Sequence, residues 1–153
     1  MVGSVVKQDA EKIERLRELT RTLMVPDEVK ERTPVILFVD DEEGIRRVFS
    51  RALAKLGPVL VAASADEALD LLKSRRVAIL ITDLCMPVHD GFWLACRAHE
   101  LDADLPIIAH TAHHRDAVVR GGIFDRVMYK TQSWREVIDV AAKLMWPRVM
   151  AVA

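Results

Sequence analysis

Three aspartates follow apolar stretches of the sequence, and their placement raises the question of shared chemistry. Asp40 and Asp41 come directly after the run VILFV, and Asp83 follows the run VAILIT. Carboxylates crowded together repel one another, and a hard cation with oxygen ligands, Mg2+ above all, is the ordinary way to hold them. A carboxylate is also a nucleophile that can take up a phosphoryl group as an aspartyl phosphate. The three residues therefore indicate a magnesium site at which one aspartate could be phosphorylated.

Two further polar residues close later stretches of the same kind. Thr111 ends the segment 106–111, and Lys130 ends the segment 126–130. In-line phosphoryl transfer needs positive charge and a hydrogen-bond donor for the phosphoryl oxygens, and a lysine and a threonine supply them. An aspartate at the end of a strand often only caps a helix or solvates a turn. Four polar strand ends gathered at one rim favour a shared site over that simpler interpretation.

The stretches before these residues are typical of buried parallel strands. We expect strands at 34–41, 59–64, 77–83, 106–111 and 126–130. Segments with apolar residues at helical spacing alternate with them, and their expected buried faces are Ile45, Val48, Phe49, Ala52 and Leu53; Ala65, Ala68, Leu69 and Leu72; Phe92, Ala95 and Cys96; and Trp134, Val137, Ile138, Ala141 and Leu144. Strands that are apolar on both sides need helices on both faces, so the pattern predicts an α/β fold with a doubly wound parallel sheet. The carboxyl ends of such strands meet at one rim, where ligands bind.

The composition narrows the class of protein. A chain of 153 residues, 51% of them hydrophobic, is long enough for one well-packed domain. The formal net charge of -1 gives no basic footprint for nucleic acid, and no apolar run approaches the roughly 20 residues of a membrane helix. Cys85 and Cys96 are too sparse for a disulfide framework. We therefore expect free thiols and a cytoplasmic protein that binds neither nucleic acid nor membranes.

The sequence resembles the receiver domain of bacterial two-component response regulators over about residues 34–146. The resemblance rests on VILFVDDEEGIRRVF, ILITDLCMPVHDG, IIAHTA and VMYK, each at the end of an expected strand and in the expected order. It implies a chemotaxis-regulator-like fold, in which five parallel strands have the order 2-1-3-4-5 and are flanked by helices. We therefore expect a receiver domain at residues 34–147.

The resemblance also implies roles for the acidic residues. Asp83 would be the phosphoacceptor, which takes its phosphoryl group from a histidine kinase or a phosphotransfer protein. Asp40 and Asp41 would hold Mg2+ together with Asp83 and the main-chain carbonyl of Cys85. The protein would then be a signalling module whose only catalysis is its own phosphorylation and dephosphorylation. A phosphatase of the aspartyl-phosphate type would need an aspartate as general acid where Cys85 stands.

In the resembling family, further residues control and read out phosphorylation. Thr111 would be the switch hydroxyl, and Lys130 would pair with the phosphoryl group. Cys85 and His113 stand two positions beyond Asp83 and Thr111, where side chains tune how fast water removes the phosphoryl group.

Several positions depart from the pattern of the family. Thr131 stands where a proline usually follows the lysine, and Val127 stands at the usual place of the switch aromatic. Tyr129 is an alternative switch candidate, because residues two apart point to the same side of a strand. The segment RDAVVRGGIF offers barely two helical turns before its glycines, so we expect a shortened fourth helix. These departures leave a second hypothesis open, a pseudo-receiver that binds proteins without being phosphorylated.

Two ends of the chain lie outside the resemblance. Residues 1–33 contain the segment EKIERLRELTRTLMVP, which predicts an extra amphipathic helix ending at Pro26. Its apolar stripe would be covered by its own domain or by a second copy of the chain in a homodimer. We expect residues 148–153 to form a tail without room for an output domain. The sequence leaves open the cognate kinase, the downstream target, and whether the chain is a stand-alone regulator or part of a larger protein.

Overall fold

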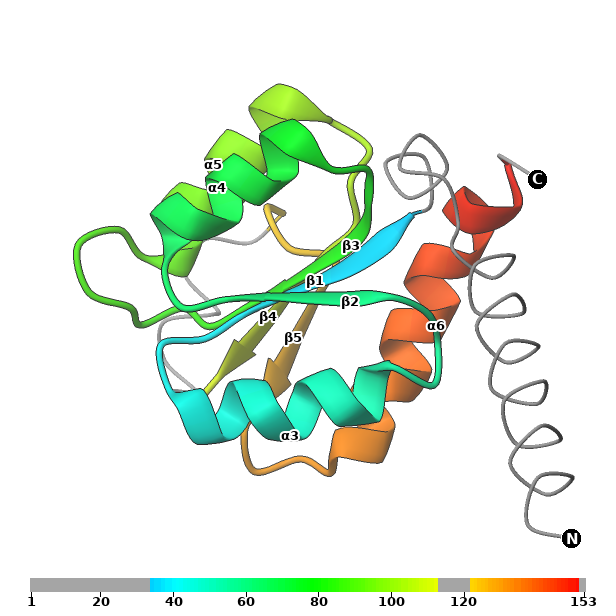
Figure 1. The fold of residues 1–153 in the computed structure, drawn as a ribbon, viewed down its shortest axis with the longest axis horizontal. Helices are drawn as coiled ribbons and strands as arrows, with labels where there is room; N and C mark the ends of the chain where they lie inside the picture. Colours follow the sequence, from blue (N-terminus) through cyan, green and yellow to red (C-terminus); the bar gives the residue numbers. More distant parts are fainter. Residues whose placement is uncertain (1–33, 113–121, 152–153) are drawn as a thin grey trace, which may run out of the picture. The chain divides into compact units, whose positions relative to one another are not determined.

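The computed structural model of the chain describes residues 34–112 and 122–151, which all belong to one compact unit, Thr33–Ala153. The helix expected at the N-terminus, the shortened helix expected after Thr111 and the candidate residue His113 fall on residues outside the described ones. Strands and helices alternate as expected (Figure 1). In chain order the elements are β1 (Val35–Val39), α3 (Glu43–Leu53), β2 (Val59–Ala62), α4 (Ala65–Ser74), β3 (Val77–Thr82), α5 (Gly91–Leu101), β4 (Ile107–Thr111), β5 (Arg126–Tyr129) and α6 (Trp134–Met150).

The five strands form one parallel sheet with the order β2-β1-β3-β4-β5 (Figure 1). The register pairs Leu37 with Leu80 and Leu80 with Ile107. The two strands that precede the aspartates, β1 and β3, are therefore neighbours in the interior of the sheet, and β2 and β5 are its edges. The predicted α/β class, the parallel sheet and the strand order are confirmed.

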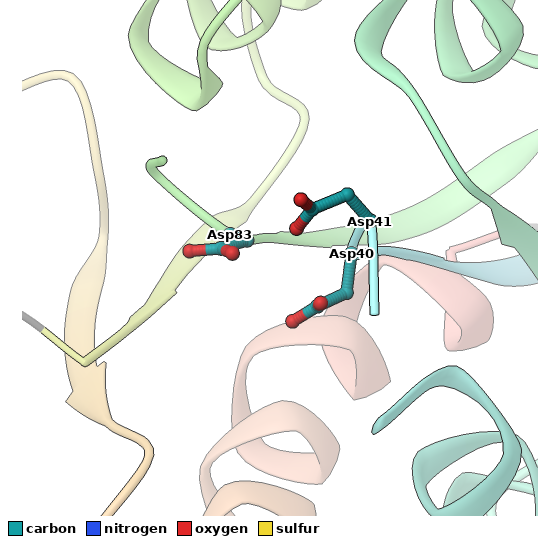
Figure 2. A group of neighbouring side chains, drawn as sticks. All are labelled: Asp40, Asp41 and Asp83. Atoms are coloured by element: carbon teal, nitrogen blue, oxygen red, sulfur yellow. The ribbon is translucent and has the colours of Figure 1, made fainter. Parts of the chain in front are cut away.

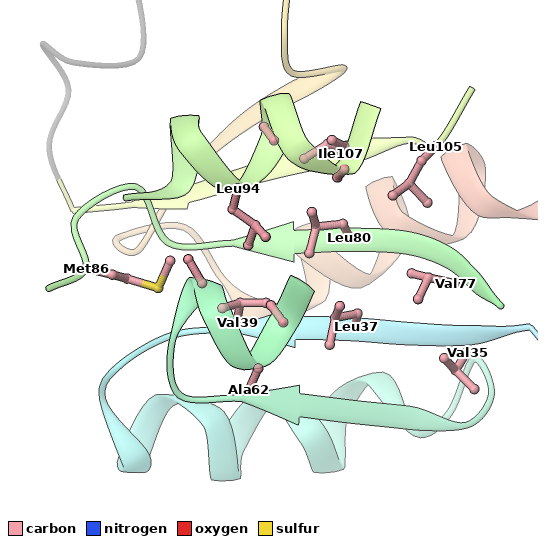
Figure 3. Packing of buried hydrophobic residues seen from close by; sticks show 14 residues of the cluster. Val35, Leu37, Val39, Ala62, Val77, Leu80, Met86, Leu94, Leu105 and Ile107 are labelled. Atoms are coloured by element: carbon pink, nitrogen blue, oxygen red, sulfur yellow. The ribbon is translucent and has the colours of Figure 1, made fainter. Parts of the chain in front are cut away.

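The sheet separates two layers of buried side chains, because successive residues of a strand point to opposite faces. On one face, Leu37 and Leu80 pack with Leu94 of α5 and with residues of α4 (Figure 3). On the other face, Ile79 packs with Phe49 of α3 and with residues of α6. Burial of one such side chain contributes about 1.5–3 kcal/mol. The two layers together fix the interior strands whose ends carry the aspartates.

The buried faces expected for the helices are only partly right. Phe49 and Leu53 of α3 are buried, but Val48 is 51% exposed. On α5, Ala95 is buried while Cys96 is exposed. Successive helical residues are about 100° apart, so Val48 and Cys96 lie at the edge of the stripe that faces the sheet.

The last helix extends further than the sequence suggested. α6 runs to Met150 and so crosses the boundary expected at residue 147. Its two tryptophans, Trp134 and Trp146, are 37% and 56% exposed. The expectation that Trp134 belongs to the buried face of this helix is therefore wrong. None of the helices in the two described ranges is both long and apolar enough to cross a membrane.

Candidate functional site

The carboxylates of Asp40, Asp41 and Asp83 converge at the carboxyl ends of β1 and β3 (Figure 2). One ligand oxygen from each lies within 4.8 Å of the other two. The main chain fixes both loops, since the Asp83 amide donates to the Val39 carbonyl at 2.8 Å and the Asp40 amide donates to the Ala62 carbonyl at 3.2 Å. Asp40 and Asp83 are buried, whereas Asp41 is exposed. The aspartates selected from the sequence therefore share one pocket.

Lys130 reaches this pocket from the end of β5, and its side chain is only 15% exposed. Its Nζ lies 2.9 Å from Asp40 Oδ2, 3.1 Å from Asp83 Oδ2 and 3.2 Å from Glu42 Oε1. The Lys130 amide donates to the Thr111 carbonyl at 2.9 Å, which ties its backbone to the end of β4. A single ammonium group thus contacts three carboxylates.

The pKa values of Asp40 and Lys130 are both raised, although burial acts on the two groups in opposite directions. Burial raises the pKa of Asp40, and the contact with Lys130 offsets this only in part. Burial by itself would lower the pKa of Lys130, but its contacts with Asp40 and Asp83 outweigh it and raise that pKa. The contacts with carboxylates therefore favour the cationic form of Lys130, whereas burial disfavours the ionised form of Asp40, which further positive charge would stabilise.

The turn between β1 and α3 is held by two residues that sequence reasoning missed. Asp40 Oδ1 accepts a hydrogen bond from the Glu42 amide at 2.9 Å, and the Asp40 carbonyl accepts one from Arg46 Nη1 at 2.7 Å. Arg46 lies on the first turn of α3, six residues after Asp40, so no pattern in the local sequence reveals the contact. These bonds orient both polar groups of Asp40.

The loop after β3 is held in a similar way. Thr82 Oγ1 donates to the Asp83 carbonyl at 2.9 Å, and the Cys85 amide donates to Asp83 Oδ1 at 3.3 Å. Gly91, at the start of α5, packs so closely that a Cβ there would run into the Asp83 carbonyl oxygen. Sequence reasoning assigned Gly91 no role, although its place in the motif DLCMPVHDG was a usable signal. The hydrogen bond from the Cys85 amide places Cys85 directly beside the Asp83 carboxylate.

Thr111 and the two switch candidates lie on β4 and β5. Thr111 is buried at the end of β4, where the register pairs it with Tyr129 of β5. Val127 packs against a small apolar cluster formed by Leu84, Phe92 and Ala109. Val127 is therefore a packing residue in the described structure, and Tyr129 is the candidate next to the threonine.

Side-chain hydrogen bonds close the turn after Lys130, where Thr131 stands in place of the usual proline. The Tyr129 amide donates to Gln132 Oε1 at 2.8 Å, and the Gln132 amide donates to the Tyr129 carbonyl at 2.8 Å. Gln132 Nε2 also donates to Glu136 Oε2 at 2.9 Å, and Ser133 caps α6. The side chain of Gln132 thus links β5 to α6 and secures the backbone on both sides of Lys130.

The donor set of the pocket fits a hard divalent cation. All three side chains offer carboxylate oxygens, which Mg2+ prefers, and the ion usually takes only one or two of them and keeps water or phosphate oxygens in its remaining positions. Asp41 lies on the exposed side of the trio, and Asp40 and Asp83 are buried. Among the described residues, Asp40, Asp41 and Asp83 form the one group of three possible metal-ligating side chains whose ligand atoms lie this close together.

Residues 36–129 match the model of a protein family described as "Response regulator receiver domain". The chain belongs to this family. The match contains the aspartates of the pocket and the strands that carry them, and it ends one residue before Lys130.

Curated relatives of this receiver domain agree with the assignment. The chain is 38% identical over 93 residues to the "Probable transcriptional regulator ycf27" of Guillardia theta, with 60% of this chain and 35% of the relative covered. It is 34% identical over 91 residues to the "Transcriptional regulatory protein AfsQ1" of Streptomyces coelicolor, with 59% and 40% covered. The chain therefore spans well under half the length of these relatives.

Solved structures share the fold of this receiver domain. A response regulator receiver domain protein of Clostridium thermocellum has a TM-score of 0.70 at 20% identity, with 77% of this chain and 98% of that chain covered. The response regulator protein TrrA of Thermotoga maritima, in complex with Mg2+ and BeF, has a TM-score of 0.67 at 28% identity, with 72% and 98% covered.

Proposed function

We propose that this receiver domain accepts a phosphoryl group on Asp83 from a histidine kinase or a phosphotransfer protein. The observation that carries the proposal is the placement of Asp83, whose Oδ2 lies 3.1 Å from Lys130 and whose carboxylate lies within 4.8 Å of those of Asp40 and Asp41. A lone buried carboxylate would be costly, but one held between an ammonium group and a cation site is suited to phosphoryl transfer.

In the proposed reaction, an Asp83 carboxylate oxygen forms a bond to phosphorus while the P–N bond of the donor phosphohistidine breaks. The electron pair of that bond stays on the imidazole nitrogen, and a proton balances its charge. Lys130 stabilises the phosphoryl oxygens, and the hydroxyl of Thr111 is the second donor. Mg2+, held by Asp40, Asp41, Asp83 and the carbonyl of Cys85, would neutralise charge on the aspartates and on the transferring group.

The response of the domain follows from the same residues. Thr111 binds the new phosphoryl group, and Tyr129, next to it across the sheet, is the aromatic that changes position. Cys85 and His113 tune the attack of water that returns Asp83 to its resting state. The domain catalyses nothing beyond its own phosphorylation and dephosphorylation. TrrA of Thermotoga maritima, solved with Mg2+ and BeF, supports the magnesium assignment by analogy.

The pseudo-receiver alternative rested on the missing proline, on the valine at the aromatic position and on the short fourth helix, and the last of these lies outside the described residues. Gln132 closes the turn that the proline would shape, and Tyr129 stands beside Thr111, so neither of the first two departures speaks against phosphorylation. A homodimer through residues 11–26 remains a prediction, as do the domain limits and the kinase partner.

Incubation with Mg2+ and phosphoramidate, followed by intact mass spectrometry, tests the proposal. We expect the mass gain of one phosphoryl group, lost in Asp83→Asn because the amide is not a nucleophile. Asp70→Asn changes an exposed aspartate on α4 in the same way and should leave the gain unchanged. A wild-type protein that gains no mass, or an Asp83→Asn variant that still does, would refute the assignment of Asp83.

A further inference from the structure

Glu42 stands at the N-cap of α3 but does not cap the helix. N-cap positions favour Ser, Thr, Asp or Asn, whose short side chains accept a bond from the first helical turn. Glu42 makes no such side-chain bond. Its carboxylate instead points to the pocket, where Oε1 lies 3.2 Å from the ammonium of Lys130, a residue 88 positions away in the sequence.

This contact is one of two side-chain hydrogen bonds that Lys130 donates among the described residues. Its Nζ donates to Glu42 Oε1 at 3.2 Å and to Asp83 Oδ2 at 3.1 Å, and Asp40 Oδ2 lies 2.9 Å away as an ion-pair contact without hydrogen-bond geometry. Three carboxylates thus surround the ammonium group, and a phosphoryl oxygen that arrives at Asp83 has to take the place of one of them beside Nζ.

Glu42 is the acceptor that can leave most readily. The side chains of Asp40 and Asp83 are 0% and 6% exposed, whereas that of Glu42 is 64% exposed. An exposed ion pair opens at little cost, because water replaces the lost contact. Once displaced, the Glu42 carboxylate still sits at the mouth of the pocket, well within the roughly 8 Å over which physiological salt screens charge.

We infer that Glu42 is a specificity-determining residue that selects phosphodonors by charge. The inference rests on phosphorylation of Asp83 as proposed above. The donor displaces Glu42 from Lys130 and then lies next to a negative charge, so a donor with more negative charge reacts more slowly. A small dianionic donor such as acetyl phosphate is disfavoured relative to phosphoramidate, which is mainly a monoanion at neutral pH.

The rates of Asp83 phosphorylation by acetyl phosphate and by phosphoramidate test this, at saturating Mg2+ and constant ionic strength, with intact mass as the readout. We expect Glu42→Gln to raise the rate with acetyl phosphate about fivefold and the rate with phosphoramidate about twofold, because one charge repels the dianion more strongly. The difference between the donors should shrink as salt rises.

Glu43→Gln is the matched control, since it removes the same charge from the adjacent exposed residue, which is not among the described contacts of Lys130. Both of its rates should stay close to those of the wild type. Equal effects of Glu42→Gln and Glu43→Gln, or equal acceleration with both donors, would overturn the role of Glu42 while leaving phosphorylation of Asp83 intact. A wild-type protein that accepts phosphate from neither donor would overturn both proposals.

Discussion

Carboxylates outnumber cationic side chains in the pocket around Lys130. One ammonium group contacts Asp40, Asp83 and Glu42, and Asp41 adds a fourth carboxylate to the same loop region. These four carboxylates face two cationic side chains, Lys130 and Arg46, so the resting pocket is short of positive charge. The electrostatics of single residues therefore predict a stabilising effect of divalent cations that can be measured without any phosphodonor.

Millimolar Mg2+ should raise the melting temperature of the protein, because a ligand that binds only the folded state stabilises it by mass action. A gain of about 1 kcal/mol corresponds to roughly 4 °C in a domain of this size. Asp41→Ala should abolish the rise, and Asp70→Ala, at an exposed position on α4, should retain it. Scanning calorimetry that finds no magnesium-dependent shift in the wild type would contradict the cation site.

His110 is a buried residue for which the proposed chemistry has no use. It is 1% exposed, its ring lies edge-on to Phe49 with centroids 4.7 Å apart, and its Nδ1 has no hydrogen-bond partner within the described ranges. Burial, with a smaller contribution from Lys130, lowers its pKa from 6.5 to about 4. Between about pH 4 and pH 6.5, His110 is therefore neutral in the folded protein and protonated in the unfolded chain.

The sign of the resulting pH dependence follows from linkage. Below pH 6.5 the unfolded state binds a proton that the folded state refuses until about pH 4, so stability falls as the pH drops between these values. The full loss is about 3 kcal/mol. His110→Leu should be close to the wild type at pH 7 and clearly more stable than it at pH 4.5 in urea unfolding. Parallel curves for the two proteins across this range would show that His110 does not titrate in this way.

At the scale of elements, the turn from β5 to α6 decides where Lys130 points. Gln132 replaces the bracing that a proline would give with two side-chain hydrogen bonds, one to Tyr129 and one to Glu136. A proline limits the backbone directly, whereas a glutamine does so only while its bonds persist. The position of Lys130 should therefore be sensitive to this single side chain.

Gln132→Ala should leave the Tyr129 amide without its acceptor and cost about 1–2 kcal/mol of stability. It should also slow the phosphorylation of Asp83, because Lys130 is then less well positioned. Glu136→Gln keeps an acceptor oxygen for Gln132 and serves as the control, with stability and rate near those of the wild type. A Gln132→Ala variant that loses stability but keeps the full phosphorylation rate would confine Gln132 to a structural role.

At the scale of the whole molecule, the fold followed from the sequence because its signals are local. Apolar runs separated by segments of helical periodicity sufficed for the α/β class and the parallel sheet, and the family resemblance supplied the strand order. The two runs that are followed by aspartate also placed Asp40, Asp41 and Asp83 at one rim. Contacts between distant positions could not be read in that way. Lys130 with Glu42, and Gly91 against the Asp83 carbonyl, depend on how separate elements meet in space.

The strand order also divides the pocket between parts of unequal stability. Asp40 and Asp83 extend from interior strands that are paired on both sides, whereas Lys130 extends from β5, a four-residue strand at the edge. Edge strands open locally at lower free energy than interior ones. The counterion of the aspartates can thus be withdrawn by fraying of one edge, with the carboxylates still in place. Amide hydrogen exchange at Lys130 would then be faster than at Asp83, and the pocket would spend part of its time as a purely acidic site.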